Sequence, residues 1–366
     1  MPHAFRLMPH ASRLQPKKTM PHKHTEEIPS LERRHLLKKL LAGGVGLTAT
    51  GAMLSKEERI LAQELSTEAE KPDGVSGATR KATNWAKLDD LKEKMPLSKI
   101  GNVEVSRMIL GGNLIGGWAH SRDLIYVSDL VKAYHTKEKT YATFQLAEAC
   151  GVNTLLTATS VGKMLIDYRK ETGGKMQFIA DSGNDDKTIA NDGVKKAIDA
   201  GASLVYVIGE ATDRYLRNGQ FDLVGECLQR IRDEGYPAGI GAHRLEACQK
   251  CIELGFVPDF WMKTYHHHNY WSAVPGKPEH DNIFCRHPEE TAEFMNNRPE
   301  PWIAFKTLAA GSLLPQDGFR FAFEGGADFI CVGMYDFQIV DDVNICTDIL
   351  KGDLPRKRAW RTANIS

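Results

Sequence analysis

Between residues 95 and 350, short apolar segments alternate with segments of helical periodicity. The first apolar segment ends in the glycines of SRMILGGN, and the others lie at 153–157, 177–180, 204–208, 238–242, 259–263, 302–305 and 328–332. Strands that alternate with helices form a parallel sheet, which is buried on both faces. Eight repeats in about 250 residues predict a closed α/β fold, the (β/α)8 TIM barrel. No G-x-G-x-x-G follows the first strand, which favours the barrel over an open doubly wound sheet.

The residues on either side of 95–350 predict appendages rather than a second core. Residues 1–30 are rich in His, Pro and Lys without an apolar period, and are expected to be disordered. Residues 56–94 are charged and weakly periodic, as in a linker with short helices. Residues 351–366 are expected to form a C-terminal tail. The barrel therefore carries a disordered or helical N-terminal extension in this prediction.

Residues 31–55 join paired arginines, Arg33 and Arg34, to a weakly apolar run from Leu40 to Leu54. That run is too short and too rich in glycine to span a bilayer permanently. The order of basic, apolar and small residues resembles a twin-arginine export signal, with Leu36 where phenylalanine is usual. The resemblance implies export by the twin-arginine machinery to the periplasm, or membrane association through an uncleaved signal. An ordinary amphipathic helix is the alternative.

Charge and cysteine content narrow the classes of partner. Lys and Arg number 47 and so do Asp and Glu, so the net charge gives no reason to expect nucleic acid. Seven cysteines cannot form a complete disulfide framework. Cys248 and Cys251 fit two positions on one helix better than half of a zinc site. The expected partner is a small-molecule substrate.

Three motifs in the second half of the chain resemble the aldo/keto reductases. FKTLAAGSL at 305–313 is similar to the segment at the seventh strand of their barrel, and FICVGM at 329–334 with QIVDDVN at 338–344 to the eighth strand and the acidic helix start after it. The hairpin-like start around Gly101 and Asn102 also resembles theirs. The resemblance covers roughly residues 95–350. It implies an aldo/keto reductase-like barrel, with NADPH as the family's cofactor.

The catalytic residues of that family are nevertheless missing. The resemblance places Leu156 at the position of the family's Asp, and the Tyr position falls near Val161. Asp181 stands in place of the Lys, and Gly209 or Glu210 in place of the His. Without the tyrosine and its lysine, carbonyl reduction by that mechanism lacks its proton donor. The fold is expected to carry over, and the activity is not.

The predicted strand ends carry a different polar set, which defines candidate metal ligands and catalytic groups. Asp181, Glu210, His243 and His266 are carboxylates and imidazoles expected on one face of the barrel. Such ligands suit Zn, Mn, Fe or Ni with open positions for substrate. A metal-free polar pocket and a structural cluster of ion pairs remain alternatives.

Four residues are expected to act in catalysis: Asp181, Glu210, Lys263 and Lys306. A partly desolvated lysine at a strand end can serve as a base or form a Schiff base. A salt bridge between either lysine and Asp181 or Glu210 is the competing interpretation.

Two long connections supply candidate substrate-binding residues: Asn113, Trp118, His120 and Arg122 at the start of the connection after the first strand, and Tyr265, His267 and Trp271 in the loop 265–287. Insertions after a barrel strand lie over the active face. Mixed aromatic and polar residues often face carbohydrate rings, although Trp271 is equally consistent with loop packing.

The leading hypothesis is therefore an exported barrel enzyme for a carbohydrate-like substrate, a metal-assisted isomerase or epimerase, a lyase or a hydrolase. The second is an NAD(P)-dependent oxidoreductase that uses His243, Lys263 or Glu210 as its acid. Quenching of tryptophan fluorescence by NADPH or NADH would distinguish it. The third is a non-catalytic barrel that binds a ligand, for which mutation of the site would abolish binding and no chemistry.

Overall fold

The computed structural model describes residues 84–119, 124–183, 192–270, 272–273 and 282–364. All of them belong to one compact unit, Gly74–Ser366. The expected disordered segment 1–30 and export signal 31–55 lie outside the described residues, as does most of the expected linker 56–94.

Eight parallel strands form the centre of this unit and close on themselves. Their order around the barrel is β10-β3-β4-β5-β6-β7-β8-β9. The bounds are β3 Met108–Gly111, β4 Thr154–Thr157, β5 Gln177–Asp181, β6 Leu204–Val207, β7 Ala238–Ala242, β8 Phe260–Thr264, β9 Trp302–Phe305 and β10 Phe329–Val332. The pairing of Ile330 with Met108 joins the last strand to the first. The predicted (β/α)8 barrel is confirmed.

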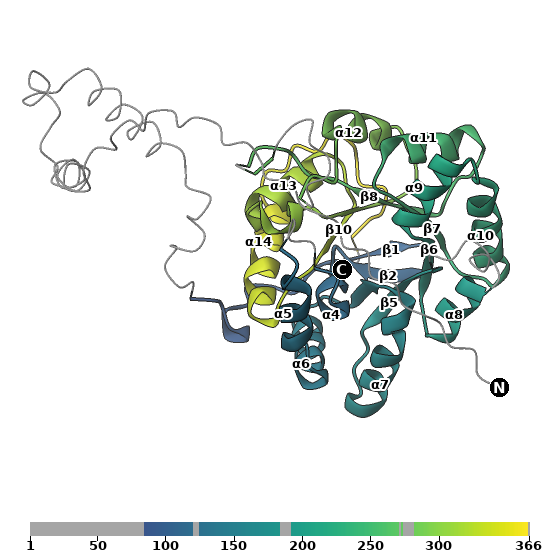
Figure 1. The fold of residues 1–366 in the computed structure, drawn as a ribbon. Coiled ribbons are helices and arrows are strands. Elements are labelled where there is room, and N and C mark those ends of the chain that lie inside the picture. Colours follow the sequence, from purple (N-terminus) through teal and green to yellow (C-terminus); the bar gives the residue numbers. More distant parts are fainter. Residues whose placement is uncertain (1–83, 120–123, 184–191, 271, 274–281, 365–366) are drawn as a thin grey trace, which may run out of the picture. The chain divides into compact units, whose positions relative to one another are not determined.

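Helices surround the barrel (Figure 1). They are α4 Asn113–Gly116, α5 Val127–Tyr134, α6 Lys137–Ala149, α7 Gly162–Thr172, α8 Val194–Asp199, α9 Gly209–Asn218, α10 Asp222–Asp233, α11 Leu245–Glu253, α12 Pro288–Asn296, α13 Pro315–Glu324 and α14 Ile339–Lys351. Gly173 and Gly219 end α7 and α9 in the left-handed conformation that glycine adopts most easily. Within the described residues, no helix is long and apolar enough to cross a membrane.

The sequence pattern predicts only one helix between β6 and β7, near 221–234, whereas the structure has two. The additional helix, α9, buries Ala211, Thr212, Asp213 and Tyr215. Ala211 and Tyr215 on the buried face are four residues apart, as in a helix, but α9 has only 10 residues, fewer than the window of about 11–18 in which a helical period is read from sequence.

The interior of the barrel is filled by side chains. Ile109, Ile179, Tyr206, Phe260 and Met262 belong to one buried cluster with the residues of the neighbouring strands. A Cβ on Gly239 would lie 2.3 Å from the ring of Phe260, so β7 makes room for the larger neighbours by having glycine on this face. A substrate therefore has no space inside the barrel and must bind at one end.

The floor of the barrel, where the strands begin, is closed by a hairpin and by the residues after α14. The hairpin strands β1 Leu97–Ile100 and β2 Val103–Ser106 pair antiparallel and place Ile100 and Val105 in the interior cluster. Ser98 donates its hydroxyl hydrogen to the carbonyl of Ala363 at 2.6 Å. The residues expected to form a tail are thus part of the floor.

A buried ionic cluster holds these residues in place. Asp328, fully buried just before β10, forms ion pairs with Arg358 and, at 3.8 Å, with Arg356. Its carboxylate also accepts hydrogen bonds from the backbone N–H groups of Trp302 at 3.0 Å and Arg361 at 2.8 Å. Burial lowers the pKa of Arg356 to about 10, and Asp328 opposes that shift. The Asp328 carboxylate is therefore the counter-ion of two buried arginines from the segment after α14.

Asp328→Asn should destabilise the protein by about 3–5 kcal/mol, because the substitution leaves buried guanidinium groups without a counter-ion. Midpoints of guanidinium chloride unfolding measure the change. Asp348→Asn is the matched control: Asp348 pairs with Lys92 at 2.5 Å, but both side chains are more than half exposed, so little change is expected. Equal losses of unfolding free energy in Asp328→Asn and Asp348→Asn would contradict the role of Asp328 as a buried counter-ion.

Candidate functional site

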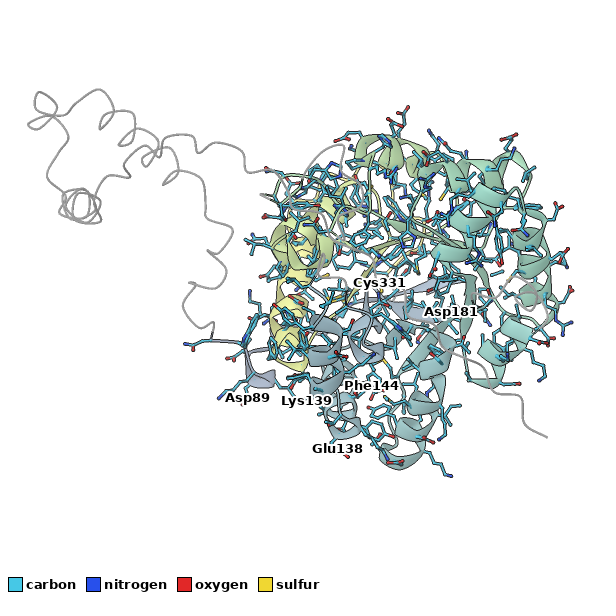
Figure 2. The ribbon with its side chains drawn as sticks, in the orientation of Figure 1. Asp89, Glu138, Lys139, Phe144, Asp181 and Cys331 are labelled. Carbon is cyan, nitrogen blue, oxygen red and sulfur yellow. The ribbon has the colours of Figure 1, made fainter. Side chains whose placement is uncertain are left out.

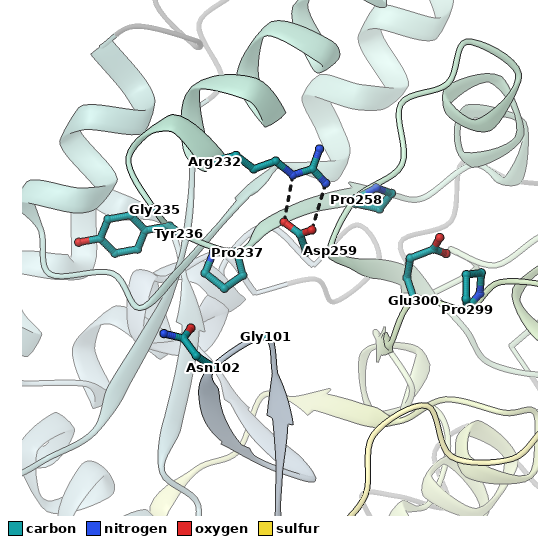
Figure 3. A pocket seen from close by; sticks show the side chains of 10 residues that line it. All are labelled: Gly101, Asn102, Arg232, Gly235, Tyr236, Pro237, Pro258, Asp259, Pro299 and Glu300. Atoms are coloured by element: carbon teal, nitrogen blue, oxygen red, sulfur yellow. Dashed lines mark hydrogen bonds and ion pairs between the residues drawn. The ribbon is translucent and has the colours of Figure 1, made fainter.

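Two of the cavities in the described residues lie at opposite ends of the barrel. One, of about 660 Å³, is at the floor and is shown in Figure 3. Gly101 and Asn102 of the hairpin turn line it, and Arg232 and Asp259 form an ion pair at 3.1 Å on its wall. The other, of about 180 Å³, lies beyond the ends of β7 and β8. We take the second as the candidate site, because barrels of this kind bind substrates where their parallel strands end.

An aspartate and a histidine form the centre of this candidate site. His243 follows β7, and its Nδ1 lies 2.9 Å from Oδ2 of Asp213 on α9. The same carboxylate accepts hydrogen bonds from the backbone N–H groups of His243 at 3.2 Å and Arg244 at 3.1 Å. Asp213 therefore fixes both the ring and the turn that bears it. Since a carboxylate accepts, Nδ1 bears the hydrogen and Nε2 is left with a lone pair.

The charge state of His243 follows from its surroundings. Burial lowers its pKa below the usual 6.5, and the positive charges of Lys306 and Lys263 lower the pKa further, whereas Asp213 opposes the shift. The imidazole is therefore neutral near pH 7. A neutral imidazole with one free nitrogen, oriented by a carboxylate, can accept a proton from a substrate.

Asp213 was not predicted from the sequence, which pointed instead to Glu210 in the same stretch, VIGEATD. Glu210 is exposed in the first turn of α9, whereas Asp213, three residues later, is only 6% exposed. Asp213 is the carboxylate that contacts the His243 ring. Had α9 been predicted, Asp213 would have been a candidate as well, because residues three apart on a helix lie on the same side of it.

Lys263 is buried beside the candidate site and donates hydrogen bonds to the backbone there. It is 1% exposed, and its ammonium donates to the carbonyls of His243 at 2.8 Å and Thr264 at 3.0 Å and to Oγ1 of Thr264 at 2.8 Å. All three of its hydrogens have acceptors, so the predicted role as base or Schiff-base former does not match this geometry. Lys263 instead holds the ends of β7 and β8 together.

Lys306 lies at the end of β9 in an unusual backbone conformation. Its φ of 56° is left-handed, and Ala309 and Ala310 nearby have φ values of 45° and 55°. No other non-glycine residue in the described ranges has a positive φ. The Lys306 ammonium lies 3.6 Å from the ring centroid of Phe284, a cation–π contact. Strained backbone of this kind costs about 1–3 kcal/mol per residue and tends to occur at functional sites.

Asp181 ends β5, where the sequence analysis placed it. Its carboxylate accepts a hydrogen bond from the N–H of Gly183 at 2.9 Å, and burial raises its pKa above the usual 3.8. Tyr206 is the residue of β6 paired with Asp181; burial raises the pKa of Tyr206, and the Asp181 charge raises it further. Figure 2 shows Asp181 in the middle of the molecule, together with Cys331 of β10.

The remaining predicted residues of the 265–287 loop have structural contacts. Nε2 of His266 accepts hydrogen bonds from the N–H groups of Phe284 at 3.0 Å and Cys285 at 3.1 Å, and Nδ1 donates to the carbonyl of His267 at 3.0 Å. Tyr265 is buried against Phe321 of α13, with ring centroids 4.7 Å apart. Tyr265 and His266 are therefore packing residues, and His267 contacts the edge of the Phe321 ring.

The four predicted metal ligands do not come together. Both ring nitrogens of His266 have backbone partners, Nδ1 of His243 has Asp213, and Glu210 is exposed. Among the residues that the structure describes, no three His, Cys, Asp or Glu side chains are placed to hold a metal ion. This donor set does not fit a metal centre.

The predicted substrate residues after β3 are only partly described. Asn113 begins α4 and is exposed, and Trp118 is also exposed, with its ring against Gly116. His120, Arg122 and Trp271 lie outside the described residues.

Asp336, in the turn after β10, accepts hydrogen bonds from the Tyr134 hydroxyl and, at 3.0 Å, from Lys139.

Comparison with solved structures places this fold among the aldo/keto reductase-like barrels. Two structures assigned to the aldo-keto reductases, both from Pseudomonas aeruginosa, match the chain with a TM-score of 0.51. Sequence identities are 15% and 16%, over 71% of this chain and 98% and 99% of those chains. No protein-family model and no curated protein matches the sequence. At this identity the likeness establishes the fold, and the expected aldo/keto reductase-like barrel is confirmed.

The free energy of unfolding should decrease when the pH is lowered, because acid protonates His266. Its pKa is lowered by burial from 6.5 to about 4, so the unfolded chain binds this proton more readily. The stabilisation is complete above about pH 6.5 and is lost as the pH falls to about 4. The advantage of wild type over His266→Asn in unfolding free energy should shrink by about 3 kcal/mol across this window.

Urea unfolding at steps between pH 7 and pH 4 measures that difference. His287→Gln is the control, because His287 is more than half exposed and should leave the pH dependence as in wild type. A constant difference between wild type and His266→Asn at every pH would show that His266 does not titrate in this way.

Proposed function

We propose that the protein is an enzyme that moves a proton on a small carbohydrate-like molecule, with His243 as the general base and acid. The observation that supports this proposal is the Asp213–His243 hydrogen bond of 2.9 Å at the end of the barrel where substrates bind. The reaction class that fits best is isomerisation, epimerisation or elimination beside a carbonyl group.

In the proposed mechanism Nε2 of His243 removes a proton from the substrate and later returns it. Asp213 stabilises the imidazolium that forms, because its carboxylate already accepts the Nδ1 hydrogen. The positive charge of Lys306, which lowers the pKa of His243, would equally stabilise a negative charge that develops on the substrate oxygen beside it. No step requires a residue of the lost reductase tetrad.

Asp181 is the second proton-transfer group in this proposal. Burial raises its pKa, which favours the protonated form that an acid must have. It stands on β5 and His243 follows β7, with β6 between them. Two groups of different acidity on separate strands suit a reaction that removes a proton at one atom and supplies one at another.

The predicted export and the carbohydrate-like substrate belong to the proposal as well. Exposed Trp118 and Asn113 after β3 offer an aromatic face and an amide, which suit hydroxylated rings. The rival oxidoreductase function is supported by the fold alone, and binding of NADPH or NADH with quenched tryptophan fluorescence would favour it.

His243→Gln and Asp213→Asn should each slow the reaction by about 10²–10⁴-fold, because they remove the base or its orientation. Exchange of substrate carbon-bound hydrogen with D₂O, followed by proton NMR over a panel of aldoses, ketoses and sugar acids, gives the readout. Glu210→Gln is the matched control and should exchange at the wild-type rate, since Glu210 is exposed. Wild-type exchange by His243→Gln would refute the proposal.

A further inference from the structure

We infer that the cavity beside His243 binds an anionic group of the substrate, a carboxylate or a phosphate, between Arg244 and Arg286. This inference rests on the proposed function, because it assigns a substrate class to the same site. The cavity measures about 180 Å³, which is room for a small ionised group. Its walls come from the turn after β7, the end of β8 and the loop that precedes α12.

Positive charge exceeds negative charge on the walls of this cavity. Arg244, Arg286 and Lys263 line it, together with the acidic residues Asp213 and Glu246. Asp213 is already satisfied by three hydrogen bonds from His243 and the Arg244 backbone. Glu246 and Arg286 are both exposed, so water screens the charge of each. Two guanidinium groups and one ammonium thus face the cavity against two carboxylates, and with the exposed pair left out, Arg244 and Lys263 remain against Asp213.

These cations lack carboxylate partners in the part of the chain that the structure describes. Neither Arg244 nor Arg286 forms an ion pair there. The acceptors of Lys263 are uncharged oxygens of His243 and Thr264. A guanidinium presents two parallel N–H donors that match the oxygens of carboxylate or phosphate. An anion in the cavity would supply the missing counter-charge.

The position of the cavity relative to the dyad is fixed by backbone contacts. Arg244 directly follows His243, and its N–H is held by Asp213 at 3.1 Å. Arg286 follows Phe284 and Cys285, whose N–H groups are held by His266. The backbone that carries each arginine is therefore anchored, and both arginines line the same cavity as His243. An anionic group bound there would hold the rest of a substrate against Nε2.

The test measures binding of inorganic phosphate and of malonate to the full chain by isothermal titration calorimetry, in buffer of constant ionic strength made up with KCl. Arg244→Gln and Arg286→Gln should each weaken binding by about tenfold or more, the expected loss for a charged hydrogen-bond pair. Arg217→Gln, an exposed arginine on α9, is the matched control and should bind as wild type.

The two probes distinguish the sources of the anion. Binding of phosphate alone would indicate a phosphorylated substrate, malonate alone a carboxylate, and both a site for either. His243→Gln separates this inference from the proposed function, because it should lose hydrogen exchange and keep anion binding. No binding by wild type, or equal binding by wild type and both cavity arginine variants, would overturn the inference.

Discussion

Closure of the sheet between β10 and β3 determines where every loop of this protein lies. Because all eight strands are parallel, their ends form a single rim, and residues far apart in the sequence meet there. Asp181, His243 and Lys306 reach this rim from three different strands. The interior below is filled, with Gly239 leaving space for Phe260, so the rim is the place where chemistry can occur. Packing and the position of the candidate site are consequences of the same closure.

The electrostatics of the rim depend on which charges are compensated. At the floor, the Asp328 carboxylate forms ion pairs with Arg356 and Arg358 and also raises the pKa of Arg107, which burial lowers, so it is a counter-ion shared by these buried cations. At the rim, Lys263 has only neutral acceptors, and its charge acts on His243. The floor cluster is therefore suited to stability, whereas the rim has positive charge available for a bound anion.

The sequence was sufficient for the fold because its two signals, apolar strands and helical segments, repeat eight times and reinforce each other. It was less informative about the site. His243 was predicted at a strand end, and the structure places it there, but its partner Asp213 lies on a helix of 10 residues that the sequence pattern did not predict. The direction of the side chains at the end of β8 was also not predicted. Phe260 and Met262 of β8 point into the barrel, so Lys263 and Tyr265 alternate away from the interior.

The floor also bears on how the chain reaches its folded state during synthesis. Arg107 donates a hydrogen bond to Thr362, which is synthesised 255 residues later. Asp328 pairs with Arg358, which is synthesised 30 residues later. Before those residues are made, these two contacts of the floor are missing. Domains generally fold as units during translation. The contacts that close the floor can therefore form only after residues 356–364 have been synthesised.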